Sequence, residues 1–568
     1  MDTRLLKLRD FVQARNYKVF RLPSAVSAQA VNAARQAEPD LCLRSARMLE
    51  NLCRIERPLL FPGERIAYCR CNGAIPGWFG QEEAAAWNVT HRNAFYEDFN
   101  NVCPNWSLLL TQGLAGRRRI AEAGLSNGAT GRGKTFLESA IIAIDAVRDL
   151  AGRYADEADK SGNAKMAAIL RKVPFQPAGS FHEALQSLRF TASMLTLTGH
   201  RHMGFGRLDQ YLYPFYAQDR AASRLTRDEA AGLLAEFFIS LNKDSDLYSV
   251  VQQGDNGQSL MLGGMKPDGS SGVNDLTYLA MEVSCELRLI DPKINLRVDS
   301  HTPEDLLELA ARLTEAGLGF PQYSNDEVVI PALVSKGYSL EDAREYTVAA
   351  CWEFIIPARG ADIVNLGAVS FPAAVDRALR KTVGKNAFDM DVLHREICAD
   401  IKEQVANVIA QRPRAFTPSP LASVLFDGAL ESGRDIAESA RYNNLGLHGA
   451  GSAEGADALA AIAWLQTHEP EQLTRLPQIL DENFANDEEL RQRLRNEPPK
   501  VGNGDAAVDK GLTFLFDAFA DACEAVEQSG VIGDARLRPG TGSAQFYVYL
   551  SQGEQWPWMV ELFLRTRA

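Results

Sequence analysis

Apolar side chains recur every three or four positions through much of the chain, which is the spacing of helices that bury one face. The stretch 134–159 predicts a long helix of this kind, and 230–241 and 306–316 predict two more. Their starts carry capping signals. Thr226 and Glu229 form a capping box, and Pro303 after Thr302 suits the first helical position. The pattern predicts a protein with much helix.

Short β-prone runs at 294–298, 347–356 and 544–550 lie among these helices. Loops rich in Gly, Ser, Pro and Asp, such as 264–274, separate the predicted elements. No internal repeat, low-complexity segment or linker longer than a loop interrupts the chain. We therefore expect an α/β fold in one large domain that spans 1–568.

Composition and charge narrow the class of function. The chain has 568 residues, 46% of them hydrophobic and 23% charged, as expected for a folded protein with an extensive core. Its net charge of −13 comes without a basic cluster, which argues against nucleic acid or an anionic membrane as a partner. No apolar run reaches the roughly 18 residues of a membrane helix. We expect a cytoplasmic enzyme with a small-molecule substrate.

Nine cysteines occur at irregular spacing without a C-x-x-C pair, which predicts reduced thiols rather than a disulfide framework. They are Cys42, Cys53, Cys69, Cys71, Cys103, Cys285, Cys351, Cys398 and Cys523. Neither the His200-x-His202 pair nor the Cys69-x-Cys71 pair matches a common zinc spacing. No metal site is predicted.

The run from Tyr346 to Glu353 carries a cysteine and, two residues later, a carboxylate. The run delivers both to the same face of one strand or loop, since side chains two residues apart in a strand point the same way. Cys351 and Glu353 would then face one substrate, as a sulfur reactant and a general base. The structural alternatives are a buried core cysteine and a glutamate in an ion pair with an arginine.

Several segments, in order along the chain, resemble the glycyl radical enzymes, which are relatives of pyruvate formate-lyase. They include Phe181-His-Glu-Ala-Leu-Gln186, Gly206-Arg-Leu-Asp-Gln-Tyr-Leu-Tyr-Pro-Phe-Tyr216, Asn295-Leu-Arg297, Gly317-Leu-Gly-Phe-Pro-Gln-Tyr-Ser-Asn-Asp-Glu327, the Cys351 run, Arg441-Tyr-Asn443 and Pro499-Lys-Val-Gly-Asn503. The resemblance implies a barrel of two half-barrels wrapped by helices, with a cysteine finger loop at its centre.

In that family a glycine on a C-terminal loop stores a radical, which a radical S-adenosylmethionine activase installs, and the cysteine becomes a transient thiyl. The family loop reads approximately Arg-Val-Ser/Ala-Gly-Tyr, and no such string occurs among the 568 residues. We predict Gly540 and Gly542 to be turn glycines instead. The resemblance then implies a barrel truncated in its C-terminal part, with no directly bound cofactor. Its radical would come from a glycine on a small partner subunit, and a homodimer is possible.

The resemblance also indicates a reaction class. Glutamate two residues after the cysteine is similar to members that eliminate water or an amine, or that decarboxylate. Ala350 stands where pyruvate formate-lyase has the first of two cysteines, which argues against acyl transfer to coenzyme A. We predict the catalytic large subunit of a split lyase for a small polar substrate. A radical-independent enzyme using the same pocket and a catalytically silent binding paralogue remain the alternatives.

Four further residues are predicted to bind substrate. His200 and His202 precede the Gly206 segment, where the resembling enzymes place polar substrate contacts. Either histidine could contact a hydroxyl or carboxylate, or act as acid or base near neutral pH, unless it is structural or faces solvent. Gln258 and Asn325 are predicted as polar lining of the pocket.

Overall fold

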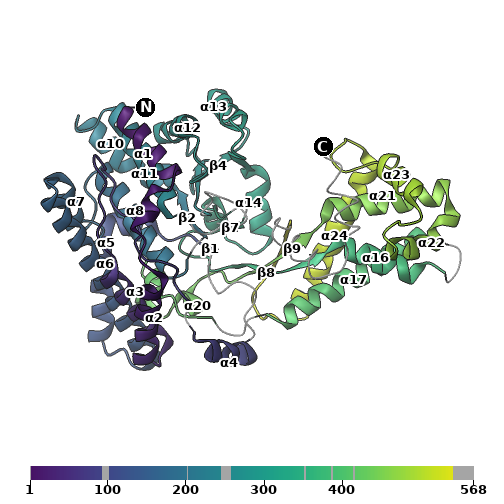
Figure 1. The fold of residues 1–568 in the computed structure, drawn as a ribbon, viewed down its shortest axis with the longest axis horizontal. Coiled ribbons are helices and arrows are strands. Elements are labelled where there is room, and N and C mark those ends of the chain that lie inside the picture. Colours follow the sequence, from purple (N-terminus) through teal and green to yellow (C-terminus); the bar gives the residue numbers. More distant parts are fainter. Residues whose placement is uncertain are drawn as a thin grey trace. The chain divides into compact units, whose positions relative to one another are not determined.

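The computed structural model describes residues 2–77, 79–91, 101–200, 202–244, 257–350, 353–384, 388–412 and 416–541 (Figure 1). The chain forms two compact units. The first comprises Met1–Val89, Glu97–Asp362 and Phe416–Tyr442, and the second comprises Thr90–Tyr96, Ile363–Ala415 and Asn443–Ala568. The organisation as a single domain stays a prediction.

Helices make up most of the first unit. They are α1 (Thr3–Gln13), α2 (Ser24–Ala37), α3 (Leu41–Ile55), α4 (Gln81–His91), α5 (Trp106–Ser126), α6 (Gly131–Lys160), α7 (Ala164–Lys172), α8 (Phe181–Leu197), α9 (Leu208–Tyr211), α10 (Tyr213–Ala221), α11 (Arg227–Leu241), α12 (Asp275–Leu287), α13 (Glu304–Glu315), α14 (Asp326–Ser335), α15 (Leu340–Arg344), α18 (Pro420–Ser423), α19 (Ala429–Ser432) and α20 (Ile436–Ser439), with 3-10 turns η1 (Asn16–Phe20) and η2 (Asn242–Asp244). Helix α3 packs on α2 and α6, and helices α5 and α7 also pack on α6.

The three predicted helices are confirmed, with one correction. Helix α6 covers the predicted 134–159, and α11 begins with the predicted capping box of Thr226 and Glu229. Helix α13 begins at Glu304, so Pro303 is its N-cap residue rather than its first helical residue. The Thr302 hydroxyl instead accepts a hydrogen bond from the Asp299 N–H at 2.9 Å.

The first unit contains a parallel sheet in the order β1-β2-β3-β4-β5. Its strands are β1 (Asn101–Val102), β2 (His202–Arg207), β3 (Ser259–Gly263), β4 (Lys293–Val298) and β5 (Gln322–Asn325). Strand β4 confirms the run predicted at 294–298. Because successive side chains of a strand point to opposite faces, Lys293, Asn295 and Arg297 share one face, and Ile294 and Leu296 share the other.

The run predicted at 347–356 is two strands rather than one. Strands β6 (Thr347–Ala349) and β7 (Glu353–Ile355) pair antiparallel, with Ala349 opposite Glu353. Ala350, just after β6, has a left-handed backbone with φ of 62°. We call β6 and β7 the finger hairpin. The chain therefore reverses between Ala349 and Glu353, as a finger loop requires, and the β-prone run at 347–356 is not one continuous strand.

The second unit is built around a three-stranded parallel sheet in the order β10-β9-β8. Its elements are β8 (Ile363–Ser370), α16 (Phe371–Thr382), α17 (Met390–Ala410), β9 (Leu445–Ala450), α21 (Ser452–His468), α22 (Pro470–Asp481), α23 (Glu488–Asn496), α24 (Ala506–Gln528) and β10 (Leu537–Thr541). Helices α16, α17, α21 and α24 pack together, as Figure 1 shows. The Phe371 ring meets those of Phe516 and Phe519 nearly edge-on.

Two sequence predictions fall in this second unit. Gly540 lies within β10, opposite His448 of β9, so its prediction as a turn glycine is wrong. Gly542 and the run at 544–550 lie outside the described residues. Within the described ranges of the chain, no helix combines the length and apolar character that crossing a bilayer requires.

Candidate functional site

The finger hairpin lies against one face of the five-stranded sheet. Val348 of the hairpin and Met261 of β3 belong to one buried cluster, which also contains Tyr346. A β-carbon built on Gly204 of β2 would lie 2.8 Å from the Val348 carbonyl oxygen. Only glycine therefore allows β2 to come so close to the hairpin. Met261 and Gly204 therefore lie on the face of the sheet that points toward the finger hairpin, and so do the residues that share this face with them.

Strand register extends this face across the sheet. Asn295 lies opposite Met261, and Gln322 lies opposite Asn295. Ser259 lies opposite Gly204 and precedes Met261 by two residues. Directly paired residues of neighbouring strands lie on the same face. Ser259, Asn295 and Gln322 therefore face the hairpin.

The same rule adds two residues from the first strands. His202 precedes Gly204 by two residues, and Asn101 lies opposite His202. We call Asn101, His202, Ser259, Asn295 and Gln322 the polar row. It crosses the sheet toward the amino-terminal ends of β2 to β5, beneath the hairpin.

Several polar atoms here have no hydrogen-bond partner among the described residues. They are Asn101 Nδ2, Gln258 Oε1, Asn295 Oδ1, Gln322 Oε1 and, on the hairpin, Thr347 Oγ1. Asn101, Gln258 and Asn295 are at most 4% exposed. A buried polar group left unpaired costs about 1–3 kcal/mol, so such a concentration is unusual in a purely structural sheet. These atoms are suited to bind the hydroxyl, amine or carbonyl groups of a polar ligand.

His202 packs against the residue that precedes Gln258, just before β3 begins. A β-carbon on Gly257, whose φ is 65°, would lie 2.5 Å from the His202 ring, so this glycine packs against the imidazole. Gln258 follows, and its carbonyl oxygen accepts a hydrogen bond from the Lys293 N–H at 2.8 Å. The fold thus brings His202 against Gly257, although their positions are far apart in the chain.

Glu353 reaches the same region through the hairpin. It is the first residue of β7, is half-buried and lies opposite Ala349. Ala350, which follows Ala349 in the chain, accepts a hydrogen bond at its carbonyl oxygen from the Ser259 hydroxyl. This bond joins the finger hairpin to β3 at the residue after Gln258. Cys351 lies outside the described residues.

The other two predicted residues lie at the carboxyl end of β5 and just before β2. Asn325 is exposed at the carboxyl end of β5, where its side chain accepts a hydrogen bond from the Glu327 N–H and caps α14. His200 is buried just after α8, and its backbone N–H donates to the Leu195 carbonyl at 3.1 Å. Substrate binding by Asn325 or His200 stays a prediction.

A buried ion pair holds the root of the finger hairpin. The Arg297 guanidinium donates to both carboxylate oxygens of Asp326, at 2.7 and 2.9 Å, and to the Arg344 carbonyl at 2.7 Å. The Tyr346 hydroxyl donates to Asp326 at 2.7 Å, and the Tyr346 ring centroid lies 4.1 Å from the Arg297 guanidinium carbon. Burial raises the pKa of Tyr346 above its ordinary value, so the phenol stays protonated and able to donate.

Ser259, Asn295 and Gln322 were not predicted as site residues from the sequence. For Asn295 a signal was present, since polar and apolar residues alternate through Lys293-Ile-Asn-Leu-Arg297. Such alternation predicts a strand with one polar face. A polar face on a strand of an extensive core indicates either paired charges or a ligand.

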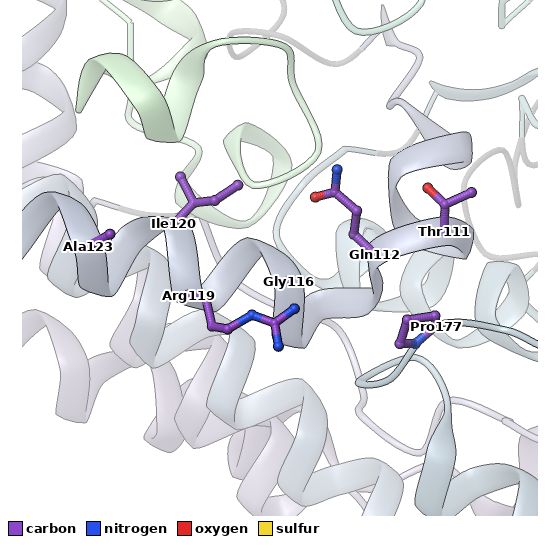
Figure 2. A pocket seen from close by; sticks show the side chains of 7 residues that line it. All are labelled: Thr111, Gln112, Gly116, Arg119, Ile120, Ala123 and Pro177. Carbon is purple, nitrogen blue, oxygen red and sulfur yellow. The ribbon is translucent and has the colours of Figure 1, made fainter.

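The structure also has a surface hollow away from the hairpin. Its volume is about 420 Å³, and it is lined by Thr111, Gln112, Gly116, Arg119, Ile120, Ala123 and Pro177. Figure 2 shows that all but Pro177 come from α5, which bends at Gly113. The hollow contains neither a nucleophile of the predicted site nor a carboxylate. Over the described ranges, no group of three or more His, Cys, Asp or Glu side chains could hold a metal ion.

The chain matches known proteins over most of its length. Residues 77–551 match the family described as pyruvate formate lyase-like. The (2S)-3-sulfopropanediol dehydratase of Klebsiella oxytoca is 26% identical over 470 residues, which are 75% of this chain and 57% of that relative. The isethionate sulfite-lyase of Bilophila wadsworthia is 30% identical over 463 residues, which are 73% of this chain and 55% of that relative. The chain spans just over half the length of these two relatives.

Solved structures show the same fold. A glycyl radical enzyme from Archaeoglobus fulgidus superposes with a TM-score of 0.79 at 22% sequence identity, over 94% of this chain and 81% of that one. The predicted glycyl radical enzyme fold is confirmed.

Proposed function

Because the chain belongs to the pyruvate formate lyase-like family, we propose that it carries the substrate pocket and reactive cysteine of a glycyl radical lyase. The supporting observation is the polar row beneath the finger hairpin, with its buried and unpaired amide groups. These groups face the segment that leads into Cys351. They suit a small substrate that carries hydroxyl or amine groups.

In the proposed reaction, Cys351 acts as a thiyl and takes a hydrogen atom from a substrate carbon. An adjacent bond to oxygen, nitrogen or carbon then breaks, and Glu353 transfers the proton that the leaving group or the substrate requires. The hydrogen atom finally returns from the cysteine to the product radical. The net reaction is dehydration, deamination or decarboxylation. The polar row and His202 orient the substrate, and the buried face of the sheet excludes water.

The radical glycine of this proposal lies on a small partner subunit, which a radical S-adenosylmethionine activase oxidises. The relatives named above are a dehydratase and a sulfite-lyase, which supports bond-breaking chemistry of this class. We further propose that the working enzyme is a homodimer of this chain together with the small subunit.

The first test is anaerobic affinity purification from the native host, with intact-mass identification of accompanying chains. A partner with an Arg-Val-x-Gly-Tyr loop supports the split enzyme. With activase, that complex should give a glycyl radical signal in electron paramagnetic resonance and turn over a panel of diols, amino alcohols and hydroxy acids. Oxygen should abolish the activity.

Variants then assign the chemistry. Cys351→Ala and Glu353→Gln should each lower kcat by about a thousandfold or more, the scale on which a reacting group or general base acts. Cys398→Ala is the matched control, because this cysteine is exposed on α17 in the second unit. Full activity of Cys351→Ala contradicts the proposal. Activity that survives oxygen and needs Cys351 indicates the radical-independent enzyme.

A further inference from the structure

The residue before Cys351 has a backbone conformation that side chains other than glycine rarely adopt. Ala350 has φ of 62° and is 3% exposed. In this left-handed region the β-carbon of an L-residue crowds the following carbonyl oxygen. Such a conformation persists only where the surrounding structure holds it. The interactions of Ala350 therefore determine how the chain enters Cys351.

The Ala350 carbonyl oxygen accepts a hydrogen bond from the Ser259 hydroxyl. Ser259 is fully buried and is the first residue of β3. Its backbone lies between Gly204 of β2 and Lys293 of β4, in the middle of the sheet. The donor is thus fixed on a rigid element, which is what accurate positioning requires.

The neighbouring strand holds the hairpin at a close distance. The β-carbon position of Gly204 lies 2.8 Å from the Val348 carbonyl oxygen and 3.6 Å from the Ala349 Cα. The last residues of β6 therefore lie directly against β2, and the Ser259 bond acts on the residue that follows them. Close packing orients β6, and the Ser259 hydroxyl orients the turn.

We infer that Ser259 is a positioning residue that keeps Ala350 in its left-handed conformation and so fixes the backbone that leads into Cys351. Without the hydroxyl, the Ala350 carbonyl loses its donor and the residue relaxes toward an extended conformation, which turns the next peptide group. The catalytic meaning of this inference rests on the proposed function. The structural part concerns the Ala350 backbone alone and can be measured without any radical.

A double-mutant cycle tests the inference, with variants Ser259→Ala, Ala350→Gly and their combination in the full chain. The readout is the rate at which iodoacetamide alkylates Cys351, measured by peptide mass spectrometry, with the exposed Cys398 as an internal reference. Ser259→Ala should change the alkylation rate about fivefold, which corresponds to the net contribution of one hydrogen bond. Glycine adopts positive φ without steric cost. Adding Ser259→Ala to Ala350→Gly protein should therefore alter the alkylation rate by about twofold or less.

Two matched variants control for unspecific effects. Ser259→Thr keeps the hydroxyl and should stay within about twofold of the parent rate. Ser240→Ala removes another buried hydroxyl, which donates to the Phe237 carbonyl at 2.7 Å in α11, and should also leave the rate unchanged. If Ser259→Ala does not fold, Ser259→Cys replaces it, since a thiol of similar size is a weak donor.

Two results would overturn the inference. Either Ser259→Ala changes the alkylation rate by the same factor in the parent and in Ala350→Gly protein, or it changes the rate in neither. In active enzyme, Ser259→Ala should lower kcat and leave KM within about twofold, because a positioning residue acts on the reacting group rather than on substrate binding. Coupling in the labelling cycle without any lyase activity would contradict the proposed function and leave the positioning role standing. Activity without coupling would contradict the positioning role alone.

Discussion

The two parallel sheets of this protein differ in whether their buried polar side chains have hydrogen-bond partners. In the three-stranded sheet, His448 is 8% exposed, and both ring nitrogens are bonded, Nδ1 to the Thr541 carbonyl at 2.9 Å and Nε2 to Asn365 Oδ1 at 2.8 Å. In the five-stranded sheet, Asn295 is 1% exposed, and its Oδ1 has no partner within the described part of the chain.

Burial alone does not separate structural from functional polar groups. A buried group whose bonds are complete contributes to stability, whereas a buried group left open costs free energy that folding does not recover. Buried polar groups without a hydrogen-bond partner persist where a ligand supplies the missing hydrogen bond. The comparison therefore separates polar groups whose loss should lower stability from those whose loss should weaken binding.

The largest expected effect concerns Arg297, which faces the hairpin and yet is fully paired. Arg297→Ala should lower the free energy of unfolding by about 3–5 kcal/mol, because it leaves the Asp326 carboxylate buried without its partner. Urea denaturation of both proteins measures this. Arg227→Ala, which breaks an exposed pair with Glu282, should cost about 1 kcal/mol or less. A loss for Arg297→Ala as small as that of the control would break the rule that paired groups on this face are structural.

The next effect depends on pH. Glu56 is fully buried and accepts hydrogen bonds from Cys71 N–H, Asn72 N–H and the Asn72 side chain. Burial raises its pKa from 4.5 to about 7, against the lowering effect of these donors. The folded protein therefore binds this proton more tightly than the unfolded chain does. This contribution to stability is complete below pH 4.5 and is lost as pH rises through about 7.

Glu56→Gln should remove this pH dependence. Between pH 4.5 and about 7, wild-type protein should lose up to about 3 kcal/mol of unfolding free energy relative to the variant. Urea titrations at several pH values measure the difference. Glu315→Gln, at an exposed position of α13, is the control and should leave the wild-type profile in place. If the unfolding free energies of Glu56→Gln and wild-type protein change with pH in parallel, this carboxyl titrates alike in the folded and unfolded states.

A smaller loss is expected in the three-stranded sheet. His448→Leu should cost about 1–3 kcal/mol, because it removes the ring's contacts with the Thr541 carbonyl and the Asn365 side chain and leaves these groups without that partner. Adding Asn365→Leu should return part of this loss, because one of those two polar groups is then removed as well. Thermal and urea unfolding of both variants measure the coupling. Additive losses would show that the bond between His448 and Asn365 contributes nothing.

The smallest effect on stability is expected at Gln258, whose side-chain oxygen is open. Gln258→Leu should change the free energy of unfolding by about 0.5 kcal/mol or less, because no bond to Oε1 is lost. The KM of the lyase should rise about tenfold, the factor that corresponds to one lost polar contact with the substrate. A variant as unstable as His448→Leu would show that Gln258 belongs with the structural groups.

Local pattern was sufficient to predict much of the fold. The apolar spacing of 134–159 predicts α6, and Thr226 with Glu229 predicts the start of α11, because these signals depend only on neighbouring residues. The same kind of reasoning was wrong at two turns. Ala350 carries no turn signal because alanine rarely adopts positive φ, so local pattern did not indicate the reversal between β6 and β7, and only the resemblance implied a finger loop here. Pro539 and Gly540 carry a strong turn signal, yet they lie in β10, at the edge of its sheet, where proline is tolerated.

By itself, the sequence determined the family, the helices with one buried face, the polar alternation of β4 and the two residues proposed to react, Cys351 and Glu353. Only the tertiary structure decided which polar groups are satisfied. The Ser259 hydroxyl meets Ala350 across 91 positions, and His448 meets Asn365 across 83. Such pairs depend on strand register and on how far two backbones approach, and neither is encoded in the residues next to them.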